Sequence, residues 1–322
     1  MNSTRLSGRD LAAAVAVVVI WGSNFVAMKS ALRDFTPFQL GAARYVFAVL
    51  PLVFFIKSPK LHWKWVLMYG LFQGVGQFGF LFSALKVGMT AALASVLMQT
   101  QAFFTALFGF LLLRERMSRQ LVIALALAAL GLLCFTMPFI ANNDQFTWAN
   151  SQSGSQTAGG ATFWGLVLNL CAAAMWAASN IVARKAQQAS PDFDAVAFVV
   201  WSSLVPIAPF VLLTTTFDAD AARWANLSNW VAIPATGWLS VAYLGWIATI
   251  TAYALWTGLL KRHPANAVAP FSLGVPVVGL AAGVWILGET ITPWQWGGIA
   301  LVLAALVCVV FGHRWLARQR GA

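Results

Sequence analysis

Long apolar runs separated by short polar segments dominate this chain. Ten runs approach or exceed the length of about 20 residues that a helix needs to cross the hydrocarbon core of a bilayer. They cover residues 11–31, 37–56, 65–85, 90–113, 119–138, 162–183, 195–216, 236–258, 265–287 and 293–313. Because backbone groups in lipid must hydrogen-bond within their own segment, the pattern predicts an all-α membrane protein with ten transmembrane helices.

Two short motifs occur twice in the chain and in the same order. The segment 23–29 returns as 179–185 with five of its seven residues identical. The segment 109–115 returns as 283–289 with Gly, Leu and Glu in common. Self-similarity of this kind indicates an internal duplication in which each copy is one structural unit.

The number of spans in each half determines how the two copies are oriented. Each half holds five spans, and because five is odd the second copy must cross the membrane in the opposite direction. The sequence therefore predicts two inverted five-helix repeats, residues 1–138 and 162–322, joined by a polar linker at 139–161. Inverted repeats can rock about a site held between them, which is a known basis of alternating access.

The composition identifies lipid as the main solvent. Of 322 residues, 60% are hydrophobic and 9% are charged, and the mean hydropathy is +0.77. A soluble domain cannot bury that much apolar surface. The formal net charge of +11 would suit a nucleic-acid-binding protein, but the basic residues are sorted by loop. Nucleic acid is therefore not expected as a partner.

The distribution of Lys and Arg predicts the topology. If the N-terminus is inside, 15 basic residues fall inside, four fall outside or at the adjoining span ends, and Arg44 lies within a span. The inside set is Arg5, Arg9, Lys57, Lys60, Lys64, Arg114, Arg116, Arg119, Arg184, Lys185, Lys261, Arg262, Arg314, Arg318 and Arg320. This bias follows the positive-inside rule and predicts that both termini are cytoplasmic.

Helix starts are marked by capping residues and carboxylates. Thr36-Pro37 and Thr292-Pro293 each offer an N-cap followed by a proline at the first helical position. Glu115 and Glu289 lie just before predicted helix starts, where a carboxylate is electrostatically favoured. We expect a structural or gating role for both glutamates, with coupling to protons at the membrane edge as the alternative.

Amide and aromatic side chains within the spans predict the wall of a central cavity. In lipid, a polar side chain away from a helix end needs a partner or a water-filled space. The candidate substrate-binding residues are Trp21, Asn24, Gln73, Gln77, Phe80, Gln99, Gln101, Trp176, Asn180, Trp246 and Tyr253. At helical spacing, Gln73, Gln77 and Phe80 share a face, as do Trp246 and Tyr253. The alternatives are hydrogen bonds between helices, worth about 0.6 kcal/mol each, and ordinary packing.

Arg44 is the clearest buried charge in the sequence, and we expect a structural or gating role for it. It lies about 10 Å into its span if the helix begins near Pro37 and rises about 1.5 Å per residue. No acidic residue lies at a similar depth. Its partner is therefore either a substrate carboxylate or the exposed carbonyls of a neighbouring helix end.

The sequence offers no catalytic or metal-binding constellation. All nine carboxylates and all three histidines lie at span ends or in loops, and Cys134, Cys171 and Cys308 are scattered among apolar spans. Neither an HExxH motif nor a glycine-rich phosphate loop occurs. We therefore expect no enzyme, no cofactor, no metal, no direct use of ATP and no proton relay embedded in the membrane.

The chain resembles the EamA branch of the drug/metabolite transporter superfamily over nearly its whole length. The motifs that carry the resemblance are Trp21–Phe25, Ala43–Tyr45, Gln99–Thr105, Pro276–Leu280 and the Gly…Glu endings of the fourth and ninth spans. Gln99–Thr105 and Pro276–Leu280 are similar to those of bacterial exporters of aromatic amino acids (the YddG type) and of cysteine and O-acetylserine. Pro276 is a candidate gating residue, and the sequence departs from the pattern because Ala102 stands at the matching position of the first half.

The resemblance implies a carrier in the bacterial inner membrane that exports amino acids and related small metabolites. An exporter of organic cations is the alternative, with aromatic walls supplying cation–π contacts; a membrane enzyme is a remote one. The expected partners are a small-molecule substrate and the lipid bilayer. Gly70-xxx-Gly74 and Gly279-xxx-Gly283 are interpreted as contacts between helices of one chain, so a monomer is expected.

Overall fold

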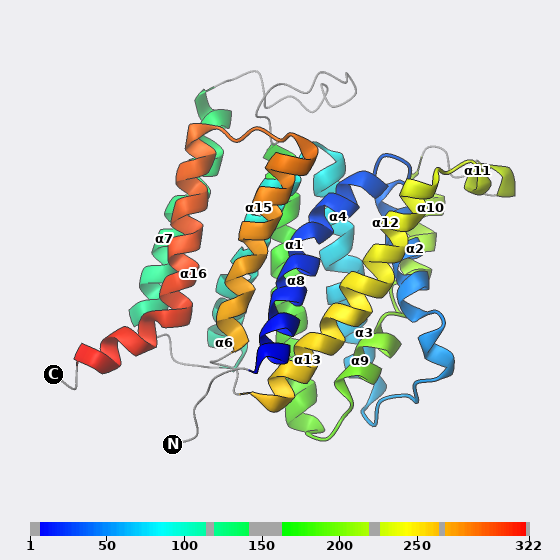
Figure 1. Ribbon diagram of the computed structural model, residues 1–322, viewed down its shortest axis with the longest axis horizontal. Helices are drawn as coiled ribbons and strands as arrows, with labels where there is room; N and C mark the ends of the chain where they lie inside the picture. The colour runs from blue at the N-terminus through cyan, green and yellow to red at the C-terminus, as the bar shows by residue number, and fades with distance from the viewer. Residues whose placement is uncertain (1–6, 114–118, 142–162, 219–225, 264–267, 320–322) are drawn as a thin grey trace.

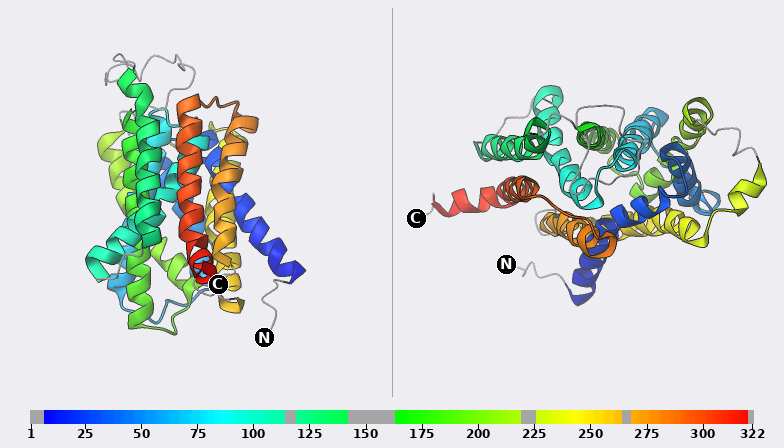
Figure 2. Two further views of the ribbon diagram at one scale, coloured as in Figure 1. Left: turned by 90° about the vertical axis from the view of Figure 1, so that its left-hand side faces the viewer. Right: turned by 90° about the horizontal axis from the view of Figure 1, so that it is seen from above.

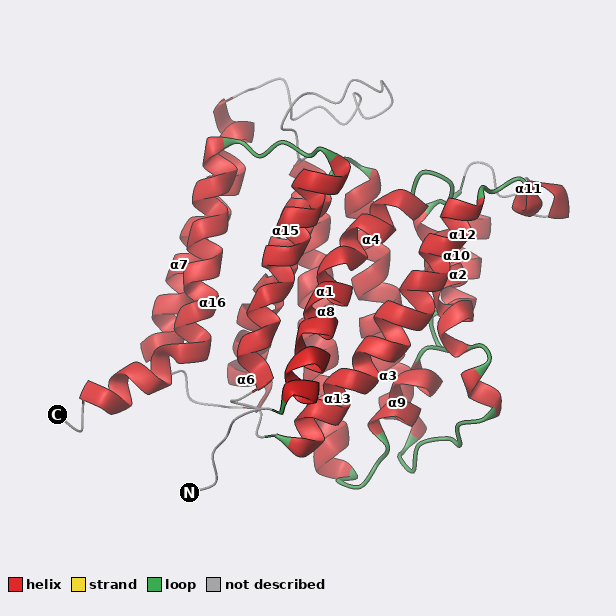
Figure 3. Cartoon of the chain, in the orientation of Figure 1, coloured by secondary structure: helices red, strands yellow, loops and turns green. Residues whose placement is uncertain are grey.

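The computed structural model describes residues 7–113, 119–141, 163–218, 226–263 and 268–319. Within these ranges the chain forms helices and loops and no strand (Figures 1 and 3). The all-α class predicted from the apolar runs is therefore confirmed.

The first half of the chain forms a series of helices, some of them divided into segments in line. In chain order they are α1 (Gly8–Ala31), α2 (Pro37–Val49), η1 (Leu52–Phe54), α3 (Trp63–Tyr69), η2 (Gly70–Phe78), α4 (Gly79–Lys86), α5 (Ala91–Leu97), η3 (Met98–Thr100), α6 (Gln101–Leu113) and α7 (Arg119–Ala141). The polar segments between the apolar runs become the loops that join them.

The second half also forms a series of helices, some of them divided into segments. Its elements are α8 (Phe163–Ala189), α9 (Ala195–Ser202), α10 (Ile207–Phe217), α11 (Leu227–Val231), α12 (Ala235–Ala242), η7 (Tyr243–Thr251), α13 (Ala252–Arg262), η8 (Ala269–Leu273), α15 (Gly274–Leu287) and α16 (Pro293–Gln319). α1 begins and α16 ends at the same end of the bundle (Figure 1).

Seven helical stretches of the described chain are long and apolar enough to cross a membrane. Two further apolar helices, Leu121–Met137 and Pro293–Cys308, are shorter within the described residues, and α2 has 13 residues. Each of the ten predicted spans thus corresponds to one helix or to several segments in line. The protein is a multi-pass membrane protein.

The second and seventh spans are less continuous than predicted. The second was expected to reach residue 56, but α2 ends at Val49 and Leu50 is extended. The reason is Pro51, which has no amide hydrogen to continue the helix and disfavours helical backbone in the residue before it. The seventh is divided into α9 and α10 by a turn that ends at Pro206.

The third and eighth spans each contain a nine-residue π-helical segment that the sequence pattern did not predict. These segments are η2 and η7. In η7 the hydroxyls of Thr249 and Thr251 donate to the carbonyls five residues earlier, at 2.8 Å and 3.0 Å. A π-helix closes its hydrogen bonds over five residues, so its turn is wider than that of an α-helix. Residues beyond the segment therefore rotate away from the face that α-helical spacing predicts.

The fourth and ninth spans each contain a 3-10 segment. η3 precedes α6, and η8 precedes α15. The ninth span has Pro276, whereas Ala102 stands at the matching position of the fourth span. The 3-10 segment forms there nevertheless, so it does not depend on a proline at residue 102.

Helix pairs recur between the two halves. α1 packs against α12, η7 and α13, while α8, which begins the second half, packs against α3, η2 and α4. α2 packs against α10, α5 against α15 and α7 against α16. The α7–α16 pair lies at one edge of the bundle, at the left of Figure 1, and Figure 2 shows the same two helices side by side.

The predicted small-residue contacts are formed between helices of the same chain. A Cβ added at Gly74 would overlap the Pro206 ring, and one added at Gly70 would lie 2.5 Å from Cβ of Val205. A Cβ at Gly283 would lie 2.8 Å from Cβ of Ala92. The missing side chains let η2 approach the α9–α10 turn and let α15 approach α5.

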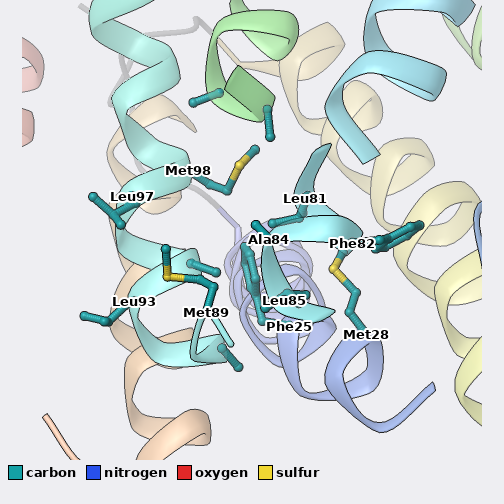
Figure 4. Packing of buried hydrophobic residues seen from close by; sticks show 14 of the residues in the cluster. Phe25, Met28, Leu81, Phe82, Ala84, Leu85, Met89, Leu93, Leu97 and Met98 are labelled. Atoms are coloured by element: carbon teal, nitrogen blue, oxygen red, sulfur yellow. The ribbon is translucent and has the colours of Figure 1, made fainter. Parts of the chain in front are cut away.

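The largest apolar cluster joins α1, α4 and α5. Figure 4 shows Phe25 and Met28 of α1 beside Leu81 and Leu85 of α4 and the adjoining Met89.

Both predicted N-caps are formed. Thr36 forms a capping box with Gln39 at the start of α2. Thr292 and Gln295 exchange the same pair of bonds at α16.

Candidate functional site

Arg44 is buried between both halves of the chain with most of its donors unused. Its side chain is 2% exposed, and Nη2 donates to Oγ1 of Thr249 at 3.0 Å. The guanidinium carbon lies 3.8 Å above the centre of the Phe78 ring, in a cation–π contact. Nε and Nη1 have no hydrogen-bond partner among the described residues. Neither an acidic residue nor a helix-end carbonyl is bonded to this arginine in the described chain.

A small cavity opens beside the Arg44 guanidinium. Its polar and aromatic lining is formed by Arg44, Tyr45, Tyr69, Gln73, Phe78, Ser202, Ser203, Thr249 and Tyr253. These residues come from α2, α3 and η2 of the first half and from α9, η7 and α13 of the second. About 20 Å³ is open to the centre of a water-sized sphere, which is room for about one water. An amino acid would require the surrounding helices to separate.

Gln73 joins three spans at one side of this cavity. Its Nε2 donates to the Tyr253 hydroxyl at 3.3 Å, and its Oε1 accepts from Oγ of Ser179 at 2.5 Å. The predicted site residues Gln73 and Tyr253 are therefore brought together, and Ser179 of the repeated motif is bonded to Gln73.

Trp21 borders the same region from α1. Its indole Nε1 donates to the carbonyl of Ala248, in η7, at 3.1 Å. Its ring centre lies 5.2 Å from that of Tyr253 and 5.5 Å from that of Trp256. Trp21, Tyr253 and Trp256 thus form an aromatic cluster, and two of its members, Trp21 and Tyr253, belong to the predicted set.

A second group of amides lies between α6 and α8. Nδ2 of Asn180 donates to Oε1 of Gln101 at 2.9 Å and to Oγ1 of Thr105 at 3.2 Å. This geometry is that of a hydrogen bond between helices, which was the alternative to a substrate contact. Trp176, one turn before Asn180 on α8, is partly buried against the apolar core.

Three further amides from the predicted wall are buried. Asn24 is 8% exposed, Gln77 is 4% exposed and Gln99 is 8% exposed. Oδ1 of Asn24 and Oε1 of Gln77 have no hydrogen-bond partner among the described residues. Because an unpaired buried acceptor costs about 1–3 kcal/mol, these two atoms are candidates for contacts with water or substrate.

Two residues expected in the wall are exposed in this structure. Trp246 is 45% exposed, its indole donates to the Leu50 carbonyl at 2.9 Å, and its ring packs on Phe47. Phe80 is 37% exposed. Gln77 is buried and Tyr253 is partly buried, whereas Trp246 and Phe80 are exposed. The wider turns of η7 and η2 change which side chains share a face.

Glu289 binds the start of a helix in the other half of the chain. Its two carboxylate oxygens accept from the backbone amides of Ala91 and Ala92 at 2.7 Å and 2.8 Å. These are unpaired amides of the first turn of α5, where a negative charge is favoured. The glutamate thus stabilises α5 rather than the following helix, α16. Glu115, its counterpart, lies outside the described residues.

Lys29 and Pro276 make further contacts between helices of the two halves and within the first half. Nζ of Lys29, at the end of α1, donates to the carbonyls of Met89 at 2.8 Å and Leu85 at 3.2 Å. Pro276 is buried, and its carbonyl accepts from Oγ of Ser95 at 3.5 Å. The Lys29, Glu289 and Pro276 contacts fix α4 and α5 of the first half to α1 and α15.

Sequence reasoning did not identify Tyr69, Ser202 or Thr249. Each lies in an apolar run with no repeat or motif to mark it. Their common feature is that they line the cavity of Arg44. The only signal was indirect, because a buried arginine requires polar neighbours from other spans.

Comparison with known proteins matches the chain to the EamA-like transporter family over residues 10–137 and 163–311. It is 39% identical over 309 residues to a probable amino-acid metabolite efflux pump of Salmonella typhimurium, covering 96% of this chain and 97% of that protein. It is 37% identical over 310 residues to a protein of the same description in Escherichia coli, with coverage of 96% and 97%.

One solved crystal structure has the same fold. It aligns with a TM-score of 0.59 at 19% sequence identity and covers 96% of this chain and 98% of its own. At that identity the likeness concerns the fold alone.

Proposed function

The chain belongs to the EamA-like transporter family, and we propose that it exports amino acids and related small metabolites whose carboxylate binds Arg44. It is a membrane transporter of small molecules and not an enzyme. The substrate class and the site are the proposed part. They rest on the two relatives described as probable amino-acid metabolite efflux pumps and on the cavity beside Arg44.

The observation that carries this proposal is the unused guanidinium edge. Arg44 has one hydroxyl partner and one aromatic face, while Nε and Nη1 are unpaired among the described residues. A carboxylate can accept two parallel hydrogen bonds from a guanidinium. Of the two partners expected from the sequence, a helix end or a substrate, the bonding of Arg44 favours the substrate.

Transport by alternating access between inverted repeats is part of the proposal. The cavity takes residues from both halves. The pairs formed by α1 with the eighth span and by α8 with the third span are those that a two-fold relation between halves would generate. In such a carrier, rocking of the halves would widen the cavity first on one side and then on the other.

The organic-cation alternative is less well supported by the site. The aromatic faces of Trp21, Tyr253 and Trp256 could attract a cation. However, Arg44 places a positive charge in the cavity, and it already covers the Phe78 face. A cationic substrate would meet repulsion there, which leaves the amino-acid class as the proposal.

The proposed location is the bacterial inner membrane, with both termini in the cytoplasm. The bias of Lys and Arg supports this orientation, and α1 begins at the end of the bundle where α16 ends (Figure 1). The carboxylates of the described chain lie at helix ends or in loops. We therefore propose that no embedded carboxylate carries protons during transport.

Flux through purified protein in liposomes tests the function. Radiolabelled amino acids should exchange across these liposomes at zero pH gradient, and ethidium should not. R44Q should abolish the exchange, while the same change at exposed Arg33, R33Q, should leave it intact. Ethidium flux without amino-acid flux would overturn the substrate class. Flux that requires a pH gradient would overturn the proposed energetics.

A further inference from the structure

A second, smaller cavity adjoins the cavity beside Arg44, and we call it the side recess. It lies between α9 and the helix formed by η7 and α13. Val199 and Tyr253 line both cavities, so the two are continuous. About 10 Å³ of the side recess is open to the centre of a water-sized sphere, which is close to the least space that holds one water.

The two cavities follow one another along a pair of antiparallel helices. From the Arg44 cavity into the side recess, the lining residues on α9 are Ser202, Val199 and Ala195, and those on the facing helix are Thr249, Tyr253 and Thr257. Steps of three or four residues are single helical turns, so the recess begins about one turn from the polar cavity. Separation of α9 from α13 would widen both cavities together.

The Arg44 cavity offers partners for both charged groups of an amino acid. Nε and Nη1 of Arg44 are buried without partners among the described residues and can donate to a carboxylate. Oγ of Ser202 is equally unpaired there, on a side chain that is 2% exposed, and it can accept from an α-ammonium. With both charged groups held in this cavity, the side chain is the part of the substrate left to enter the recess.

The side recess differs chemically from the cavity that it adjoins. Six of the eight residues that line it are alanine, valine or isoleucine, and none of these eight described residues is charged. Its two hydroxyls belong to Tyr253, which already accepts from Gln73, and to Thr257. An amide has one carbonyl and two N–H donors to satisfy, more than one hydroxyl can serve, whereas an aliphatic side chain loses no hydrogen bond there.

We propose that the side recess receives the side chain of the substrate and selects amino acids with small aliphatic side chains, from alanine to leucine. The inference rests on the proposed function, in that the Arg44 cavity is the transport site. It adds the side-chain class and makes Val199 and Ile250 specificity-determining residues. Each methylene group buried in the recess strengthens binding about fourfold.

The experiment measures exchange of radiolabelled alanine by the full chain in liposomes, with unlabelled amino acids as competitors. Leucine and asparagine have nearly the same shape, so they compare chemistry at constant size. Leucine should compete at least tenfold more strongly than asparagine, and valine about 15-fold more strongly than alanine. Aspartate should not compete. Equal competition by leucine and asparagine would show that the recess holds something else, such as a lipid chain, and would overturn the inference.

The first variant changes the polarity of the recess. V199T keeps the shape of the side chain and places a hydroxyl where the two cavities meet, so the preference for leucine over asparagine should fall at least threefold. V211T is the matched control, because Val211 of α10 is 50% exposed and lines neither cavity. The control should keep the wild-type preference.

The second variant changes the size of the recess. I250A shortens a wall residue, so competition by phenylalanine relative to leucine should rise at least fivefold. I247A is its control, because Ile247 lies in the same segment, is 38% exposed and lines neither cavity. Wild-type preferences retained in both V199T and I250A would overturn the assignment of the recess.

The results also separate this inference from the proposed function. If alanine exchanges but the ranking of competitors does not follow their side chains, the function stands and the recess is rejected as the side-chain site. If neither alanine nor any other amino acid exchanges, the proposed function itself is rejected.

Discussion

At the scale of single residues, the distinctive feature is a guanidinium buried within a membrane span. A buried charge without full hydrogen bonding is costly, and such groups in membrane spans mark functional sites. Arg44 has Thr249 as its one hydrogen-bond partner among the described residues. Thr249 in turn donates to the Leu244 carbonyl at 2.8 Å, which leaves its lone pairs to accept from the arginine.

The first prediction concerns this hydroxyl. T249V keeps the size of the side chain but removes the acceptor for Arg44, so we expect a loss of stability of about 1.5–3 kcal/mol. Unfolding of the purified protein in detergent would measure it. T251V is the matched control, because Thr251 makes the same kind of bond two residues further on, is exposed and is not bonded to Arg44. Equal losses in both variants would contradict the role of Thr249.

At the scale of elements, close packing of glycines and a carboxylate at a helix start hold spans of the two halves together. Gly74 of η2 packs against Pro206 at the α9–α10 turn, and Glu289 binds the first turn of α5. Both contacts join residues from opposite halves of the chain. They therefore report on how the two halves dock.

The second prediction tests the approach of η2 to Pro206. G74A introduces a methyl group that overlaps the proline ring, so the backbone must shift, at an expected cost of about 1–3 kcal/mol. G297A is the control, because a Cβ there meets nothing within 4 Å. The control should be neutral or slightly stabilising, since alanine favours a helix by up to about 1 kcal/mol over glycine. Thermal unfolding of both variants decides between these outcomes.

The third prediction concerns Glu289. E289Q keeps the shape but replaces a carboxylate bonded to two amides of α5, and we expect a loss of about 0.5–2 kcal/mol, as for other helix N-caps. D192N removes a carboxylate from an exposed turn and should change stability by less than about 0.5 kcal/mol. Stability of E289Q equal to that of D192N in detergent unfolding would show that this contact is dispensable.

At the scale of the whole molecule, the charge bias and the span count predict one orientation in the membrane. The 15 basic residues assigned to the inside outnumber the four assigned to the outside. The α7–α16 pair lies at the edge of the bundle (Figure 2), while the Arg44 cavity lies among spans of both halves. We propose that the remaining helices form the transport path and that this pair supports it from outside.

The fourth prediction tests the orientation. Alkaline phosphatase fused after residue 320 should be inactive, because the enzyme requires the periplasm, and a fusion after residue 150 in the linker should be active. The reason is the positive-inside rule acting on the loops. Fluorescent-protein fusions at the same two positions should give the opposite pattern. Phosphatase activity at residue 320 would reject the topology.

The sequence alone determined the helical class and the family, and it singled out Arg44 as a buried charge. Apolar runs of membrane length allow only helices or a closed barrel, so the periodicity was decisive without knowledge of packing. A lone arginine in such a run is conspicuous because its burial is costly. The caps at Thr36 and Thr292 were also predictable, since a cap is a contact within a few residues of the chain.

Tertiary structure decided which residues each side chain contacts and which helix faces are buried. Thr249, Tyr69 and Ser202 meet Arg44 from other spans, and such long-range contacts leave no local pattern in one sequence. The π-helical turns of η2 and η7 changed which side chains share a face, and Phe80 and Trp246 are exposed. Glu289 caps α5 because packing of α15 on α5 brings it there. Local sequence specifies helices and their ends, whereas the docking of helices specifies what their side chains touch.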